Sequence, residues 1–218
     1  VQGNYSKALE NQLASLKIRE EIGNKKGIGD SYNNIGSIYW YQGNYEKALE
    51  NYSASLKIRE EIGDKKGIAL SYDNIGLIYY KQGNYDKALE NYFASLKIYD
   101  ELGNKSGISG SFNNIGSIYA DQGNSDKALE NYFASLKIQE EIDDKYGIAA
   151  SYINIGSIYE DKNDYAQANN YLQKGLFQSK AIGAKDVMME IYKELSGTYE
   201  KINDYKNAYQ YHQLYAQM

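Results

Sequence analysis

One unit of about 40 residues recurs along this chain of 218 residues. Residues 43–82 return almost unchanged at 3–42, 83–122 and 123–162, and a more divergent copy follows at 163–202. A fixed period of this length indicates a repeated supersecondary unit, whose copies bury a shared core by stacking on their neighbours. We therefore expect one elongated array instead of several globular domains.

The composition excludes several classes of function. The formal net charge is −5, and no block of Lys or Arg stands apart from acidic residues, so we expect no nucleic-acid partner. The sequence has no cysteine, which excludes disulfides and thiolate chemistry. No apolar stretch approaches the ~20 residues that cross a bilayer, so we expect no membrane segment in this sequence.

Apolar, aromatic and small residues follow a helical period twice within each unit. One set lies at i, i+3, i+4 and i+7, on a single helical face: Tyr72, Ile75, Gly76 and Tyr79. A second set of helical spacing runs from Ala88 to Tyr99. Gly83 separates the two sets and can close the first helix in the left-handed conformation. Each unit is therefore predicted to be a helical hairpin.

Glycine recurs in the middle of the first helix, at Gly36, Gly76, Gly116 and Gly156. A glycine there costs about 1 kcal/mol relative to alanine, so close approach of the partner helix is the expected compensation. Alanine recurs on the second helix, and we expect Gly76 and Ala88 to form one helix–helix seam.

The order of these residues resembles the tetratricopeptide repeat signature over essentially the whole chain. The residues that carry the likeness are Tyr72, Ile75, Gly76, Tyr79, Gly83, Tyr85, Ala88 and Tyr92. The unit is about six residues longer than the usual repeat and lacks its closing proline, and it is similar to the repeats of LGN/Pins, kinesin light chain and bacterial signalling proteins. The resemblance implies an all-α, right-handed α-solenoid of stacked antiparallel helix hairpins. It also implies a concave peptide groove lined by the first helices, without enzymatic activity or cofactor.

Counted in this way, residues 1–218 form a single array. It begins with an unpaired second helix and loop at 1–27, and repeats follow at about 28–67, 68–107, 108–147, 148–185 and 186–218. Both ends fall inside a repeat, so we expect a piece of a longer protein. The segment as given favours the cytoplasm, and the periplasm stays open if a signal peptide precedes it. The near-identity of the units leaves natural duplication and engineered consensus open.

A row of polar residues lies on the first helix, opposite its packing face. Asn34, Ser37 and Tyr41 are spaced i, i+3 and i+7, and asparagine returns at the first of these positions as Asn74, Asn114 and Asn154. A side-chain amide offers a donor and an acceptor, which suits the backbone of an extended peptide. The hypothesis is an asparagine ladder that holds such a peptide. The alternative is that these asparagines are tolerated on a solvated face or bond to a neighbouring helix in the stack.

The other candidate residues of this face differ between repeats. The polar and charged ones are Asn33, Asp73, Asn113, Ser37, Ser117, Ser157, Lys81, Asp121 and Asp161, and the apolar and aromatic ones are Trp40, Tyr41, Leu77 and Tyr80. We therefore expect a protein or extended peptide partner with an apolar anchor at one end and basic residues at the other. Alternatively, the aromatic residues pack between repeats. Chaperone tails with two carboxylates are not expected, because no Lys or Arg stands beside the asparagines.

No catalytic or metal site is expected. His212 is the only histidine and takes the slot of Tyr52, which indicates packing. Paired acids such as Glu60 and Glu61 end the second helices and lie within reach of lysines such as Lys57 on the same helix. The sequence therefore predicts a non-catalytic scaffold, the sensing or docking segment of a bacterial signalling protein. The alternatives are a structural spacer or self-association into a homo-oligomer through the ends of the solenoid.

Overall fold

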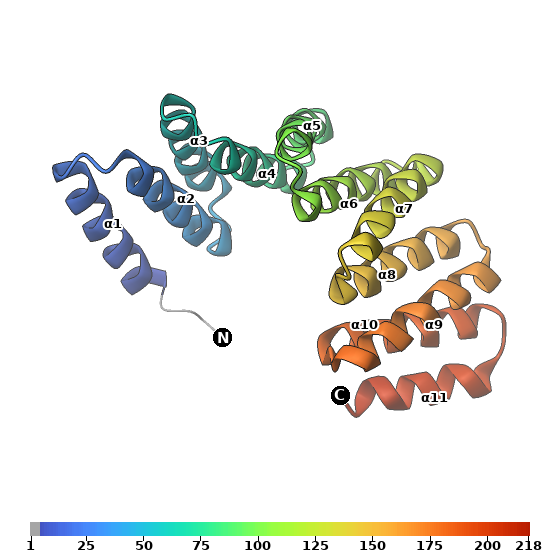
Figure 1. Ribbon diagram of the computed structural model, residues 1–218. Helices are drawn as coiled ribbons and strands as arrows, with labels where there is room; N and C mark the ends of the chain where they lie inside the picture. The colour runs from blue at the N-terminus through green and yellow to red at the C-terminus, as the bar shows by residue number, and fades with distance from the viewer. Residues whose placement is uncertain (1–4) are drawn as a thin grey trace. The chain divides into compact units, whose positions relative to one another are not determined.

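The computed structural model describes residues 5–218, and these residues form helices joined by short turns (Figure 1). Residues 1–4 of the predicted first segment lie outside the described part. The eleven helices within residues 5–218 are α1 (Tyr5–Glu21), α2 (Lys25–Tyr41), α3 (Tyr45–Glu61), α4 (Lys65–Lys81), α5 (Tyr85–Glu101), α6 (Lys105–Asp121), α7 (Ser125–Glu141), α8 (Lys145–Asp161), α9 (Tyr165–Ile182), α10 (Lys185–Lys201) and α11 (Tyr205–Ala216). The predicted all-α fold is confirmed.

The helices group into two compact units. The first unit holds α1 to α5, up to residue 104, and the second holds α6 to α11, from residue 105 onward. Within each unit a helix packs against the helices that precede and follow it in the sequence. In the second unit α10 also contacts α8, so the first helices of neighbouring hairpins lie next to one another. This stacking of helical hairpins is the arrangement of an α-solenoid.

The turn between the two helices of a hairpin is fixed by local sequence. Gly83 ends α4 with a φ of +73°, as the sequence predicted. The next residue, Asn84, caps α5 by accepting a hydrogen bond from the backbone N–H of Lys87 at 3.2 Å. Asn163 adopts a positive φ in the place of this glycine, a conformation that asparagine tolerates better than most residues.

The first helices begin slightly earlier than the repeat starts expected from the sequence, which lay near residues 28, 68, 108, 148 and 186. Helix α4 begins at Lys65, because the side chain of Asp64 accepts a hydrogen bond from the backbone N–H of Gly67 at 3.1 Å and so caps the helix. Gly67 therefore lies in the first turn of α4. A Cβ atom on Gly67 would lie 2.6 Å from Cδ of Arg59, so glycine lets the Arg59 side chain pass beside the helix.

Three of the mid-helix glycines lie against tyrosine rings of the partner helices, and Gly156 lies against Leu172. A Cβ atom on Gly76 would lie 2.9 Å from Cε1 of Tyr92, and one on Gly36 would lie 2.8 Å from Tyr52 and 3.2 Å from the carbonyl oxygen of Ala48. The close approach expected from the sequence is present. The tyrosine ring fills most of the space that the glycine leaves, and the fully buried alanines line the same core.

Ion pairs join the two helices of a hairpin. Lys65 Nζ lies 2.9 Å from a carboxylate oxygen of Glu101, and the same pairing joins Lys25 to Glu61 at 3.2 Å. Glu61 was expected near Lys57 on its own helix, but antiparallel packing brings the start of one helix beside the end of the next. The hydrogen bond from Lys65 lowers the pKa of Glu101. Exposed pairs of this kind contribute little to stability.

Candidate peptide-binding face

In each unit the asparagine row lies where neighbouring first helices meet. In the first unit, Nδ2 of Asn74 on α4 donates a hydrogen bond to Oδ1 of Asn33 on α2 at 2.9 Å. In the second, Nδ2 of Asn154 on α8 donates to Oδ1 of Asn113 on α6 at 2.8 Å. We call each of these surfaces an asparagine face. The first comprises Asn33, Asn34, Asp73 and Asn74, and the second comprises Asn113, Asn114 and Asn154.

The asparagines of the row differ in exposure. Asn34 is exposed and forms no side-chain hydrogen bond with any of residues 5–218, whereas Asn74, Asn114 and Asn154 are half-buried. An amide carries two donors and an acceptor oxygen with two lone pairs. The bond between Asn74 and Asn33 therefore leaves hydrogen-bonding capacity on both side chains. Bonding to a neighbouring helix, one of the alternatives drawn from the sequence, occurs for Asn74 and Asn154.

Two of the candidate serines are hydrogen-bonded inside their own hairpins. Tyr52 on α3 donates its hydroxyl proton to Ser37 Oγ at 3.1 Å, and Ser37 Oγ donates to the carbonyl oxygen of Asn33 at 3.1 Å. Tyr132 and Ser117 form the corresponding bond at 3.2 Å. Ser37 and Ser117 therefore link the two helices of their hairpins by hydrogen bonds. Ser157 is exposed.

The aromatic candidates are divided between packing and surface. Trp40 is half-buried and packs on a cluster that includes Ile75 and Ile78 of the next hairpin, so it serves packing between repeats. Tyr41 is 65% exposed. Its ring packs edge-to-face on Trp40, and the two ring centroids are 4.7 Å apart. Of the two, only Tyr41 is available to a partner.

The remaining candidates lie near the ends of the first helices. Leu77 and Tyr80 are half-buried, and the Lys81 ammonium lies 5.3 Å from the centroid of the Tyr80 ring, within the range of a cation–π contact. Asp121 and Asp161 are exposed. The first unit thus presents a cation and aromatic groups at these ends, and the second presents carboxylates.

Asp73 places a half-buried carboxyl group on the first asparagine face, at the position that Asn33 and Asn113 fill in other repeats. The Tyr99 hydroxyl donates to its Oδ2 at 2.9 Å, while its Oδ1 is buried without a hydrogen-bond partner within residues 5–218. Burial raises the pKa of Asp73 to about 6, although the hydrogen bond from Tyr99 acts in the opposite direction. This carboxyl group therefore changes its charge close to neutral pH.

A polar position near the ends of α1, α3, α5, α7 and α9 was not recognised as a candidate site from the sequence. Its occupants are Arg19, Arg59, Tyr99, Gln139 and Ser179. Arg59 is only 4% exposed, and Gln139 is buried and accepts a hydrogen bond from Ser151 at 2.7 Å. The available signal was the spacing, because Arg59 follows Tyr52 by seven residues and Ser55 by four, which puts a polar residue on the packing face.

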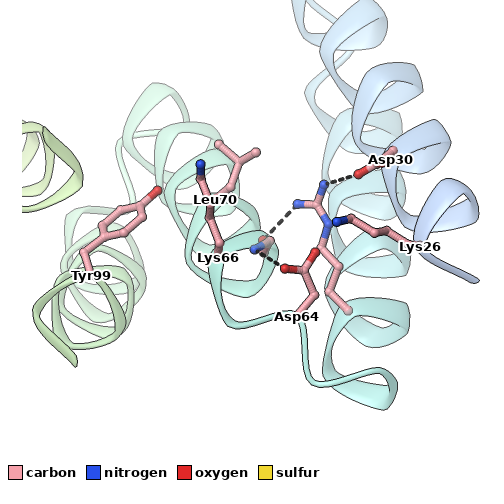
Figure 2. A pocket seen from close by; sticks show the side chains of 8 residues that line it. Lys26, Asp30, Asp64, Lys66, Leu70 and Tyr99 are labelled. Carbon is pink, nitrogen blue, oxygen red and sulfur yellow. Dashed lines mark hydrogen bonds and ion pairs between the residues drawn. The ribbon is translucent and has the colours of Figure 1, made fainter. Parts of the chain in front are cut away.

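Arg59 reaches from α3 across to both neighbouring first helices (Figure 2). Its Nη1 donates to the carbonyl oxygen of Gly67 at 2.8 Å and to Ser71 Oγ at 3.1 Å, both on α4. Its Nη2 donates to Asp30 Oδ1 on α2 at 3.1 Å. A second-helix side chain thereby contributes to the surface that the sequence analysis assigned to first helices alone.

A pocket of about 230 Å³ lies beside this arginine. Its lining residues, drawn in Figure 2, are Lys26, Asp30, Arg59, Asp64, Lys66, Gly67, Leu70 and Tyr99. Asp30 precedes Asn34 by four residues and Leu70 precedes Asn74 by four, so the pocket continues the first asparagine face toward the starts of α2 and α4. We call it the Arg59 pocket.

Other kinds of site find no support in the described part of the chain. None of the helices within residues 5–218 combines the length and apolar character that crossing a membrane requires. The same residues bring together no group of three or more His, Asp or Glu side chains that could hold a metal ion.

Comparison with known proteins gives a consistent family relationship. A model of the tetratricopeptide repeat matches residues 1–61, 27–101 and 108–176. No curated protein matches this sequence.

Solved structures of similar fold share little sequence with this chain. BtubC (BKLC) from P. vanneervenii has 18% identity and a TM-score of 0.85, over 99% of this chain and 91% of that chain. A Rap protein complexed with competence and sporulation factor has 12% identity and a TM-score of 0.72, over 99% and 70%. A signal transduction ATPase with numerous domains and a tetratricopeptide repeat sensor, from Pyrococcus horikoshii, has 20% identity and a TM-score of 0.75, over 99% and 36%.

Proposed function

Because the chain belongs to the tetratricopeptide repeat family, we propose that it is a non-catalytic scaffold that binds an extended peptide segment on its asparagine face. The family match confirms the resemblance inferred from the sequence, and tetratricopeptide repeats are a protein-interaction fold. The peptide site is our own assignment, and it is made for the first unit, where the asparagine face and the Arg59 pocket adjoin.

The observation that carries this proposal is the exposed Asn34 beside the paired amides of Asn33 and Asn74. The pairing orients two amides while leaving donors and acceptors unused. An extended peptide carries one N–H and one C=O per residue, and both need partners when they leave water. Oriented amides bind such groups whatever the side chains of the peptide, so affinity would come from the main chain and selectivity from neighbouring residues.

Solved relatives give a precedent for the role. The Rap protein of similar fold was solved in complex with competence and sporulation factor, and the Pyrococcus horikoshii protein uses a tetratricopeptide repeat as a sensor. We propose the same class of role here, the sensing or docking segment of a signalling protein.

Replacing Asn34 tests the proposed site without disturbing the fold. We expect Asn34→Ala to weaken binding of a peptide selected from a random 12-mer phage library by about fivefold to tenfold, because one hydrogen bond is lost. The urea midpoint of unfolding should not change, since the Asn34 side chain is exposed and forms no hydrogen bond with any of residues 5–218. Asn74→Ala should weaken binding and also lower stability, because Asn33 loses its donor. Fluorescence anisotropy and urea unfolding measure the two effects.

The matched control is Asn51→Ala on α3, since the Asn51 side chain donates only to the carbonyl oxygen of Lys47 in its own helix. This variant should bind the peptide as the wild type does. An Asn34→Ala variant with wild-type affinity would contradict the proposed site.

A second candidate function, self-association, is favoured by the apolar surface of α1. Ile18 is 57% exposed, whereas the equivalent Ile58, Ile98 and Ile138 are half-buried against neighbouring helices. If this surface pairs with another copy, light scattering after size exclusion should give a mass that rises with concentration, and Ile18→Glu should abolish the rise. A mass that stays at 24.7 kDa at all concentrations would exclude this candidate.

A further inference from the structure

The guanidinium group at the Arg59 pocket is buried and incompletely paired. Arginine has five N–H donors, and Arg59 directs them to Gly67, Ser71 and Asp30 in three hydrogen bonds. Its Nε is buried without an acceptor. Its one carboxylate partner among residues 5–218, Asp30, has a side chain that is 46% exposed, against 5% for Arg59. The Arg59 guanidinium lines the pocket, and its one carboxylate partner among residues 5–218 is partly solvated, so this cation can attract a further anionic group into the pocket.

Two lysines add positive charge at the mouth of the pocket. Lys26 and Lys66 are exposed, and neither forms an ion pair with any of residues 5–218. The opposing carboxylates are Asp30 and Asp64, and Asp64 already accepts the capping hydrogen bond from Gly67. Three cations therefore face two carboxylates, of which one is engaged by the backbone.

The pocket also offers an apolar wall. Leu70 on α4 is 40% exposed, and the ring of Tyr99 on α5 lines the same pocket (Figure 2). A side chain with a short apolar stem and a terminal carboxylate matches this combination, because its stem can contact Leu70 while its oxygens face the cations.

In the other repeats, the position equivalent to Arg59 does not combine a positive charge with a carboxylate partner. Arg19 donates to Gly27 and Ser31, both at 2.8 Å, but it meets no carboxylate within residues 5–218. Tyr99 and Gln139 are neutral occupants. The lysine position also changes, to Ser106, Tyr146 and Asp186, and there the Tyr146 hydroxyl donates to Asp186 at 2.7 Å. The anion-accepting combination thus belongs to the repeat that holds Arg59.

We propose that the Arg59 pocket binds a carboxylate side chain, aspartate or glutamate, of the extended segment held by the first asparagine face. This inference rests on the proposed function and assigns the residue of the partner that the first unit selects. The arginine of this pocket comes from a second helix, so it does not stand beside the asparagines in the sequence of the first helix.

The two arginines of the chain allow a direct test without a peptide. The ¹H–¹⁵N spectrum of arginine Nε–H groups contains signals from Arg19 and Arg59 only. Titrating the full chain with N-acetylglutamate amide should shift the Arg59 signal to saturation and leave the Arg19 signal in place. N-acetylglutamine amide should move neither. A shift with inorganic phosphate but none with the glutamate probe would overturn the proposal in favour of a free anion.

Peptide selection provides the second measurement. Wild-type protein should select 12-mers enriched in Asp or Glu at one position, and Arg59→Gln should lose about tenfold in affinity for them, since a charge-assisted contact is removed. Glutamine occupies this slot naturally as Gln139, so the variant should fold. Lys66→Gln, at an exposed position, should give a smaller loss. An acidic preference that is equal in the wild type and Arg59→Gln would contradict the proposal.

The two measurements separate this inference from the proposed function. If the glutamate probe shifts Arg59 but no peptide is selected, the carboxylate pocket is supported and the peptide-binding face is contradicted. If peptides bind through Asn34 but carry no acidic residue, the face is supported and the pocket assignment fails.

Discussion

We expect Gly116→Ala to lower the free energy of unfolding by about 2 kcal/mol, whereas Gly110→Ala in the same helix should raise it by about 0.5–1 kcal/mol. The two substitutions add the same methyl group to α6 and remove the same backbone freedom. They differ only in what the methyl group meets.

The physical reason is the tyrosine that packs on Gly116. A Cβ atom there would lie 2.8 Å from both Cδ1 and Cε1 of Tyr132, closer than side-chain contacts permit. The ring is 4% exposed and its hydroxyl is bonded to Ser117, so it cannot move without disturbing the hairpin. Nothing lies within 4 Å of a Cβ atom on Gly110, which leaves only the gain in helix propensity.

Urea unfolding followed by circular dichroism measures both variants, and hydrogen exchange of α6 and α7 shows whether the loss is local to the hairpin. Destabilisation of similar size in both variants would mean that glycine is required for the backbone of α6. Stabilisation by Gly116→Ala would show that the Tyr132 ring accommodates the methyl group.

We expect Asp73→Asn to stabilise the protein by about 1–3 kcal/mol at pH 8 and to have little effect below pH 4. The pKa of Asp73 is about 6 in the folded chain and 3.8 when unperturbed, because burial disfavours the charged form. The folded state therefore binds more protons than the unfolded state between these two pH values. Stability contributed by this group is complete below pH 4 and is lost as the pH rises through 6.

Asparagine removes this pH dependence and keeps the shape of the side chain. The Tyr99 hydroxyl can donate to the amide oxygen as it donates to Asp73 now, and Asn33 and Asn113 already occupy the equivalent positions. The measurement is the difference in urea midpoint between wild type and variant from pH 4 to 8, which cancels the titration of other carboxyl groups. A difference that does not change with pH would contradict the raised pKa.

The reciprocal substitution is Asn113→Asp in the second unit. It places a carboxylate at the equivalent position, beside the amide of Asn154. We expect it to destabilise the protein at pH 8, with a smaller effect at pH 4.

Much of the fold could be predicted from the sequence, because helices and turns are determined by neighbouring residues. Helical spacing predicted two helices per unit, and Gly83 and its equivalents marked the turns. Helix starts were less accurate, since the repeat that contains α4 was expected to begin near residue 68 and α4 begins at Lys65. A glycine near a helix start has two explanations, a turn or a close contact, and only the position of Arg59 distinguishes them.

The candidate site could be predicted from the sequence only in part. The period placed Asn34 and its equivalents on one face, but it did not show that Asn74 bonds to Asn33 or that Ser37 is held by Tyr52. These contacts join residues 41 and 15 positions apart, so they depend on how helices stack. Trp40 likewise required the next hairpin before its packing role was visible.

The sequence by itself determined that the chain is a tetratricopeptide repeat array, because a repeated pattern of helical periods and glycine turns is a local property of neighbouring residues. Tertiary structure alone decided which polar groups are satisfied and which remain open to a partner. Burial and hydrogen bonding depend on residues from several helices, as the contacts of Arg59 on α3 with Gly67 on α4 and Asp30 on α2 demonstrate.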